Sequence, residues 1–361
     1  MVKKVKENKI VFVGISGGVD SAVAALILIQ QGYEVVGVFI RTWSPDFIDC
    51  TWKNERREAM RVCAHLKIPF LECDAEKEYK EGVADYMISE YRKGKTPNPD
   101  VMCNREVKFG VFWQFAKKRG ADFIATGHYV HKITEGDKFM LLKNPDEGKD
   151  QVYFLWTLNQ EDLFHVIFPL GKIKKVEVRR LAKKFKLPNA NKKDSQGVCF
   201  LGQLDMKKFL EHYIDLEPGD VLNSKGEIIG HHNGAFFFTI GERHGFIIDK
   251  KYKESGPLYV VSKDFNKNTI TVSEHSPVII SKEDKNTIIS CHNTNWINTV
   301  PENNKKYQAQ IRYHGELIDC NVKTVKEDKI SVLFNKQINI DSGQSMVFYD
   351  GDICLGGAVV D

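Results

Sequence analysis

A glycine-rich loop near the start of the chain carries the clearest chemical signal. It reads Gly14-Ile15-Ser16-Gly17-Gly18-Val19-Asp20-Ser21 and lies between an expected strand, 10–13, and an expected helix, 21–31. Small residues let a backbone approach a phosphate closely, and the amide groups at the start of a helix supply donors and a favourable dipole. The sequence Gly-Lys-Ser/Thr of a Walker A loop is missing here. The loop therefore predicts a phosphate cradle of another type.

Two segments each present a cysteine in a setting rich in glycine or proline. The first, Thr96-Pro97-Asn98-Pro99-Asp100-Val101-Met102-Cys103-Asn104, is expected to be part of a loop, 94–104, stiffened by its prolines. A helix is expected from Arg105 to Arg119, and its N-terminal region would lower the pKa of Cys103 below the usual ~8.5. Asp100 is the candidate for moving protons beside this thiol.

The second cysteine segment is Asp194-Ser195-Gln196-Gly197-Val198-Cys199-Phe200-Leu201-Gly202. A single cysteine is more often a small core residue than a reactive one. Because Cys103 and Cys199 both occur in polar loops marked by glycine or proline, we predict that both are reactive. The spacing between them does not show whether the two thiols meet in space.

A concentrated positive charge precedes the second cysteine segment. Between Lys172 and Lys193 there are ten basic residues and a single acid, Glu177. The pattern fits a solvated face of an amphipathic helix, and it equally fits an electrostatic surface for a polyanion.

The elements that must position these groups alternate in type over the first half of the chain. Short β-branched runs and longer helical patterns follow one another, which is typical of parallel βαβ units and predicts a doubly wound α/β sheet. Its strands are expected at 10–13, 35–40, 70–73 and 123–126, with helices at 21–31, 55–66, 76–91 and 105–119. After an expected helix at 204–214 the pattern changes to short strands and turns. We expect domains at 1–205, 206–276 and 277–361.

Composition bounds the remaining possibilities. The chain has 361 residues, of which 42% are hydrophobic, and a net charge of +4. The longest apolar run, 22–29, is far shorter than the roughly 18–20 residues that cross a bilayer, and the lysine-rich start has no signal-peptide core. We expect a cytoplasmic protein with no membrane contact and with reduced thiols among its eight cysteines. Since no pair has C-x-x-C spacing, we expect no zinc ribbon or knuckle and assign no side chains as zinc ligands.

Taken with further motifs, the glycine loop resembles the S-G-G-x-D-S signature of PP-loop ATP pyrophosphatases. The whole chain resembles the tRNA-specific 2-thiouridylase family. This resemblance extends almost colinearly from Gly14 to Val360. It implies a PP-loop domain, a small β-rich central domain and a C-terminal β-barrel. The further motifs are Thr126-Gly127-His128-Tyr129, Lys149-Asp150-Gln151, Phe168-Pro169-Leu170-Gly171, Thr239-Ile240-Gly241-Glu242-Arg243-His244-Gly245 and Tyr349-Asp350-Gly351-Asp352.

The resemblance also implies roles for individual residues. ATP would be contacted by Gly14, Ile15, Ser16, Gly17, Gly18, Val19, Asp20, Ser21, Ile40 and Gly127. The target base would be contacted by Asn98, Pro99 and Asp100. Other tRNA contacts would come from His128, Lys149, Asp150, Gln151, Arg312, Tyr313 and Gln344. Cys103 would be a nucleophile and Cys199 would carry a persulfide. His128 is open to a second interpretation, as a core histidine at the end of a strand.

The implied reaction replaces O2 of the wobble uridine in tRNA by sulfur. ATP with Mg²⁺ adenylates the oxygen, so that sulfur from a persulfide on Cys199, supplied by a sulfur-relay protein, can displace it, either directly or after release as hydrosulfide. Cys103 would resolve the intermediate through a transient disulfide with Cys199. Three alternatives stay open: a PP-loop ligase or amidotransferase for a small substrate, a tRNA-binding protein without catalysis, and a thiolase whose Cys103, Cys199 and Asp100 hold an iron–sulfur cluster.

Overall fold

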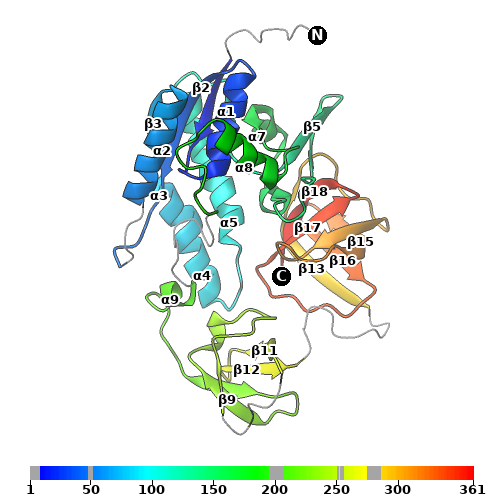
Figure 1. Ribbon diagram of the computed structural model, residues 1–361. Coiled ribbons are helices and arrows are strands. Elements are labelled where there is room, and N and C mark those ends of the chain that lie inside the picture. The colour runs from blue at the N-terminus through cyan, green and yellow to red at the C-terminus, as the bar shows by residue number, and fades with distance from the viewer. Residues whose placement is uncertain (1–8, 48–51, 195–205, 250–251, 253–255, 275–285) are drawn as a thin grey trace.

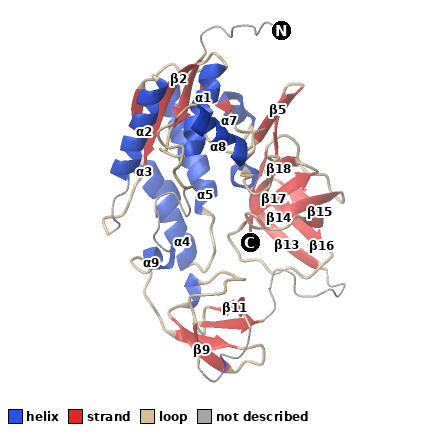
Figure 2. Cartoon of the chain, viewed as in Figure 1, coloured by secondary structure: helices blue, strands red, loops and turns tan. Residues whose placement is uncertain are grey.

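Three sheets organise the computed structural model, which describes residues 9–47, 52–194, 206–249, 252, 256–274 and 286–361. Most of the helices surround the first sheet, whereas the other two parts consist largely of strands and loops (Figure 1, Figure 2). Among the described residues, every helix is too short or too polar to cross a membrane.

The first sheet is parallel and has the strand order β3-β2-β1-β4-β7. Its strands are β1 (Ile10–Gly14), β2 (Glu34–Arg41), β3 (Phe70–Asp74), β4 (Phe123–Ala125) and β7 (Val166–Ile167). Alternate residues of β1 point into different hydrophobic clusters, Val11 and Val13 into one and Phe12 into the other. Because helices cover both faces, the predicted doubly wound α/β sheet is confirmed. The chain order reverses between β1 and β4, which is the point where sheets of this kind bind ligands.

The helix that follows the glycine loop is α1 (Val19–Gln30). It is apolar on almost every side because it lies between the sheet and α8 (Lys175–Lys184), and its residues from Ala22 to Leu28 are buried. The remaining helices of this part are α2 (Trp52–Leu66), α3 (Glu76–Tyr79), α4 (Tyr86–Arg92), α5 (Pro99–Met102), α6 (Phe112–Lys117) and α7 (Gln160–His165), with π-helical turns at Lys80–Asp85 and Cys103–Val111 and a 3-10 turn at Val152–Leu155.

The expected loop at 94–104 is wrong in its second half. The helix begins at Pro99, not at Arg105, and continues through the π-helical turn into α6. Asn98 caps it, since the Asn98 side chain accepts a hydrogen bond of 3.2 Å from the amide of Val101. An Asn cap followed by proline is a standard helix start. Cys103 therefore lies inside a helix and is only 2% exposed.

A mixed sheet forms the central part, with the order β10-β9-β8-β12-β11. Its strands are β8 (Gly219–Leu222), β9 (Ile228–His232), β10 (Ile247–Ile248), β11 (Tyr259–Asp264) and β12 (Thr269–Ser273), preceded by α9 (Met206–Leu210) and with a 3-10 turn at Ala235–Phe237. The helix expected at 204–214 is thus shorter, ending at Leu210.

Six antiparallel strands close into a barrel at the C-terminal end of the chain. They follow the order β13-β16-β15-β14-β17-β18, and the pairing of β13 with β18 completes the barrel. The strands are β13 (Thr287–Trp296), β14 (Lys306–Gln310), β15 (Ile318–Lys326), β16 (Lys329–Phe334), β17 (Ser345–Asp350) and β18 (Ile353–Val360). The expected C-terminal β-barrel is confirmed.

A hairpin from the first part of the chain extends the barrel sheet. β5 (His131–Glu135) and β6 (Lys138–Leu142) pair with each other, and Leu142 of β6 pairs with Ile353 of β18. The strands follow β4 directly in sequence, so this hairpin joins the parallel sheet to the barrel. Both domain boundaries, near 205 and 276, fall at residues outside the described part of the chain and stay a proposal.

Candidate active site

The glycine loop connects the end of β1 to the start of α1, at the reversal of strand order. Gly17 has a φ of +74° and Gly18 occupies the N-cap position without a side-chain cap. Ser21 Oγ accepts from the amide of Ser16 at 3.3 Å and donates to the carbonyl of Gly18 at 3.1 Å. The serine thus holds the loop closed from within, and the positive φ of Gly17 permits the turn. This arrangement fits an anion at the start of α1.

Gly127, at the end of β4, presses directly against the same helix start. A Cβ atom at this position would lie 2.7 Å from the amide nitrogen of Ser21, closer than real contacts allow. Ile40, near the end of β2, lies 3.7 Å from the place where a Cβ of Gly14 would be. The residues expected to contact ATP therefore share one edge of the sheet.

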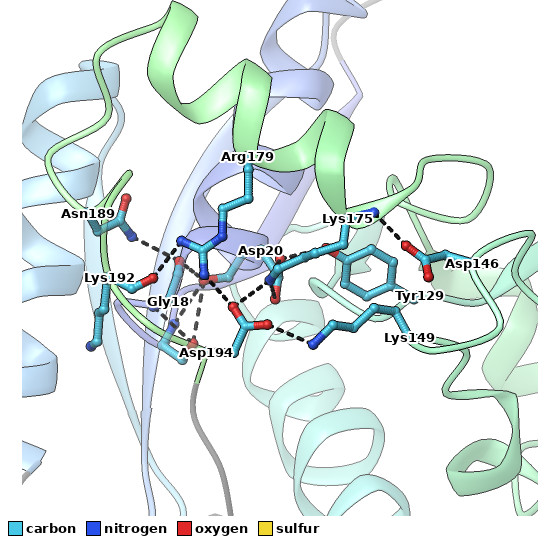
Figure 3. A network of polar contacts seen from close by, with 12 residues as sticks. Gly18, Asp20, Tyr129, Asp146, Lys149, Lys175, Arg179, Asn189, Lys192 and Asp194 are labelled. Atoms are coloured by element: carbon cyan, nitrogen blue, oxygen red, sulfur yellow. Dashed lines mark hydrogen bonds and ion pairs between the residues drawn. The ribbon is translucent and has the colours of Figure 1, made fainter. Parts of the chain in front are cut away.

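A network of charged side chains adjoins this loop (Figure 3). Lys175 Nζ contacts both carboxylate oxygens of Asp20, at 2.6 and 2.8 Å, and Asp194 Oδ1 at 2.8 Å. The Tyr129 hydroxyl donates to Asp20 at 2.6 Å. Burial, and then the Asp20 charge, raise the pKa of Tyr129, so this hydroxyl stays protonated and acts as a donor.

Part of the basic stretch 172–193 thus faces inward. Besides Lys175, Arg179 donates to Asp194 at 2.5 Å and to the carbonyl of Ala190 at 3.2 Å, and Lys192 pairs with Glu58. From the sequence, this stretch is interpreted as a solvated helix face or as a surface for a polyanion. Neither interpretation predicts basic side chains that pair with carboxylates of the same chain. The sequence does not show this, because it is the packing of α8 on α1 that brings the Lys175 side chain to Asp20 of the glycine loop.

A second set of predicted residues meets at a small cavity of about 130 Å³. Asn98 enters it from the start of α5, while Arg312, Tyr313 and Gln344 enter it from the barrel. Pro99 and Asp100 follow Asn98 in the first turn of the helix. Tyr153, which sequence reasoning did not single out, also lines the cavity, and its hydroxyl donates to the carbonyl of Ser345 at 3.0 Å.

The barrel residues of this cavity are held firmly. Arg312 donates to the carbonyl of Ile240 in the central part, and burial lowers the pKa of its guanidinium. The Tyr313 ring lies 4.3 Å from that of Phe154, and burial raises the pKa of its hydroxyl to about 12. Gln344 has a buried Oε1 without a hydrogen-bond partner among the described residues. A polar ligand would satisfy that acceptor.

A larger cleft of about 920 Å³ shares Tyr153 and Tyr313 with this cavity and separates the parallel-sheet part from the barrel. Asp150 lies in its wall, beside Lys143 and Lys172. Burial raises the pKa of Asp150 to about 6. The cleft has cationic, aromatic and hydrogen-bonding groups on its walls, which suits a nucleic-acid strand.

The neighbours of Asp150 in sequence point elsewhere. Lys149 Nζ contacts Asp194 at 2.7 Å, and Gln151 Oε1 accepts from the amide of Tyr129 at 3.0 Å. The expected tRNA-contacting triplet is thus divided between the cleft and the network beside the glycine loop.

His128 is buried, being 9% exposed. Its Nδ1 shares a hydrogen bond of 2.7 Å with the hydroxyl of Thr126, and its ring packs 5.6 Å from that of Phe109. Burial holds the pKa of His128 well below its usual value, so the ring is neutral. The structure favours the core interpretation of this residue over the tRNA contact.

All six described cysteines are buried, Cys103 among them. Cys103 packs in a cluster that Ile40 also contacts. Burial raises the pKa values of five other described cysteines to about 11 or 12, so their thiols stay protonated: Cys63, Cys73, Cys291, Cys320 and Cys354. Cys199 lies outside the described residues. Within the described part of the chain, groups of three or more side chains able to hold a metal ion are absent.

A doubly wound parallel sheet with a glycine loop at its switch point defines a nucleotide-binding protein of the PP-loop class. Consecutive segments match three family models: the tRNA methyl transferase HUP domain at 9–203, the tRNA methyl transferase PRC-barrel domain at 207–274 and the aminomethyltransferase beta-barrel domain at 286–360. With the curated relatives described next, these matches show that the chain belongs to the tRNA-specific 2-thiouridylase family.

The relatives cover the whole chain. The tRNA-specific 2-thiouridylase MnmA of Bacillus subtilis is 40% identical over 100% of this chain and 97% of its own length. That of Stenotrophomonas maltophilia is 42% identical over 97% of this chain and 93% of its own. The family models bear methyl transferase descriptions, whereas these full-length relatives are thiouridylases. Among solved structures, the U34-tRNA thiolase NcsA from Methanococcus maripaludis is 18% identical, covering 60% of this chain and 70% of its own, with a TM-score of 0.37.

Proposed function

We propose that this protein is a tRNA-uridine 2-sulfurtransferase, which uses ATP to replace O2 of the wobble uridine in tRNA by sulfur and forms AMP and pyrophosphate. The observation that carries the proposal is the place of Ile40. It lies against Gly14 of the glycine loop and packs in the same cluster as Cys103. The phosphate loop and the thiol thus approach the carboxyl edge of one sheet.

The phosphate loop supplies the first half of the chemistry. Oxygen is a poor leaving group from the C2 carbonyl of uridine, and adenylation makes its departure feasible. Gly14–Ser21 and Gly127 would hold the phosphates, with Ile40 against the nucleotide. Mg²⁺ would neutralise charge on the phosphates, and carboxylate and phosphate oxygens are its usual ligands. Asp20, in the first turn of α1, would offer such a carboxylate once its bonds to Lys175 and Tyr129 are exchanged for the metal.

The second step of the reaction, sulfur transfer, needs two cysteines with different roles. The terminal sulfur of a Cys199 persulfide would attack C2 and displace AMP, which leaves the base attached to Cys199 through a disulfide. The Cys103 thiolate would then attack Cys199 Sγ. This attack forms a Cys103–Cys199 disulfide and breaks the S–S bond between Cys199 and the base. The thiouridine leaves with the electron pair of the broken bond. A reductant must restore the thiols before the next turnover.

The cavity beside Asn98 would receive the base. A wobble nucleotide must leave its stack to reach the cavity, which suits an anticodon loop better than a duplex. Asp100, one turn before Cys103 in the helix, would manage a proton at the base or the thiol. Asp150, Arg312, Tyr313 and Gln344 would contact the surrounding RNA. A sulfur-relay protein would deliver the persulfide.

A reconstitution tests the proposal. The protein is incubated with unmodified bulk tRNA, ATP, Mg²⁺ and a persulfide donor, and the digested nucleosides are analysed by mass. We expect 2-thiouridine together with AMP. Formation of AMP without tRNA, or of no thiolated nucleoside under any donor, would contradict the proposal.

A further inference from the structure

Three cations converge on one carboxylate beside the glycine loop. Asp194 receives Lys149 Nζ at 2.7 Å on one oxygen, and Lys175 Nζ at 2.8 Å and Arg179 at 2.5 Å on the other (Figure 3). Burial by itself would raise the pKa of Asp194, but the hydrogen bonds from Lys149 and Lys175 lower it to about 2. Asp194 is therefore an anion at every pH at which the protein works.

The same cations lie next to the start of α1. Lys175 also contacts both oxygens of Asp20, in the first turn of that helix, and its side chain is only 13% exposed. Lys175 and Arg179 are one turn apart on α8, so they present their charges on the same side of that helix. The cluster is thus fixed in place by a helix that packs on α1.

Asn189 orients the backbone of the glycine loop. The Asn189 side chain is buried, and its amide nitrogen donates to the carbonyls of Gly17 at 3.0 Å and Gly18 at 2.9 Å. These two carbonyl oxygens are therefore turned toward Asn189 and away from any anion that approaches the amides of the loop. The loop and the cation cluster together form a surface for negative charge.

We propose that Lys149, Lys175 and Arg179 bind phosphate groups of ATP, and that Asp194 occupies their place as an internal competitor until ATP binds. A phosphate chain offers more charge and more acceptor oxygens than one carboxylate. When ATP binds to the loop, its phosphates therefore displace Asp194 from the three cations. The inference rests on the proposed function, because it assumes that Gly14–Ser21 bind ATP.

If Asp194 competes with ATP for these cations, removing a cation and removing the Asp194 charge should change the affinity for phosphate ligands in opposite directions. Removing a cation, in Lys175→Met, weakens the binding of ATP and of inorganic pyrophosphate at least tenfold, and it leaves adenosine binding unchanged. Removing the competing charge, in Asp194→Asn, strengthens the binding of pyrophosphate and ATP several-fold. An ordinary structural role for Asp194 would give weaker binding instead.

Titration calorimetry of the full-length protein with ATP, pyrophosphate and adenosine tests both effects. Lys183→Met is the matched control, since Lys183 is an exposed lysine of the same helix. Lys175→Arg keeps the charge and is expected to recover most of the pyrophosphate affinity. Thermal unfolding of each variant verifies that it is folded.

Each outcome decides the inference. Equal affinities in Lys175→Met and Lys183→Met, or weaker or unchanged pyrophosphate binding in Asp194→Asn, would overturn it while leaving the proposed function intact. Loss of adenosine binding together with pyrophosphate binding in Lys175→Met would assign Lys175 a purely structural role and also overturn it. Failure of the wild-type protein to bind ATP would instead refute the proposed function.

Discussion

Lys263 of the central sheet and Asp341 of the barrel form an ion pair of 2.8 Å in which each side chain is only 6% exposed. Asp341 also accepts from the amide of Ile240 at 2.6 Å and from the hydroxyl of Thr96 at 3.3 Å. One carboxylate therefore joins all three parts of the chain. Thr96 stands two residues before Asn98, so this junction supports one wall of the cavity that we assign to the base.

Breaking that pair should be costly. Lys263→Met leaves a buried carboxylate without its ion-pair partner, and the loss of one partner from a buried ion pair typically costs about 3–5 kcal/mol. We expect a loss of this size in the free energy of unfolding, measured by urea titration. Lys267→Met is the control on the same hairpin, because its pair with Asp264 is exposed and 3.9 Å long, and such pairs contribute about 0–1 kcal/mol. Equal losses in both variants would refute the junction.

Gly127→Ala should impair nucleotide binding. The new methyl group would collide with the backbone at Ser21, which cannot move without shifting the start of α1. Overpacking of this kind costs about 1–3 kcal/mol, and we expect a similar loss in the binding free energy of ATP, measured by calorimetry. Gly256→Ala is the control, since a Cβ atom there meets open space. Wild-type ATP affinity in Gly127→Ala would contradict the close contact.

The sequence was most informative where local chemistry decides the structure. Parallel strands at 10–13, 35–40, 70–73 and 123–126 agree with β1 to β4 within about a residue, because β-branched runs between helical patterns have few other arrangements. The glycine loop was equally readable, since few other residues permit such a turn.

The rest depended on contacts distant in sequence. The hairpin β5–β6 pairs with β18 more than 200 residues later in the chain. The sequence of a short polar hairpin does not indicate which distant strand it will pair with. Lys175 and Asp194 are 19 residues apart, and only the packing of α8 on α1 brings them together at Asp20. Two local patterns also predict the wrong helix ends: Asn98-Pro99 indicates a cap as well as a loop, and the helix expected to reach 214 ends at Leu210.

Replacement of each proposed reactive cysteine should stop the reaction at a different step. Cys199→Ser cannot carry a persulfide, so we expect no 2-thiouridine but continued AMP formation that depends on tRNA. Cys103→Ser cannot resolve the disulfide to the base, so we expect a tRNA–protein adduct that a reducing agent releases. Nucleoside mass analysis and denaturing gels check both.

The control for both cysteine variants is Cys320→Ser, at a buried position of the barrel strand β15. It should retain thiolation wherever it is folded. Loss of AMP formation in a folded Cys199→Ser protein, or an adduct-free Cys103→Ser protein, would refute this division of roles.

Asp150 should make stability depend on pH. Because burial raises its pKa from 3.8 to about 6, the folded state binds its proton more tightly than the unfolded state does. This stabilising effect is fully present below pH 4 and is lost as the pH rises through 6, by about 3 kcal/mol. Asp150→Asn should remove this component from the free energy of unfolding measured between pH 4 and 7. An identical pH profile in the variant would refute the assignment.

Residues of the basic stretch 172–193 should divide into two groups. Arg179 bonds to Asp194 and to backbone carbonyls, whereas Lys174 and Lys183 are exposed. We therefore expect Arg179→Met to lower the melting temperature and the affinity for ATP. The double charge reversal Lys174→Glu with Lys183→Glu should leave both unchanged and weaken tRNA binding, with a smaller dependence of affinity on salt, because each lost phosphate contact lowers the slope by about one. Binding of tRNA across a salt series by filter retention measures that slope. An unchanged slope would mean that the exposed lysines are ordinary solvated surface and that the stretch acts only through its inward-facing members.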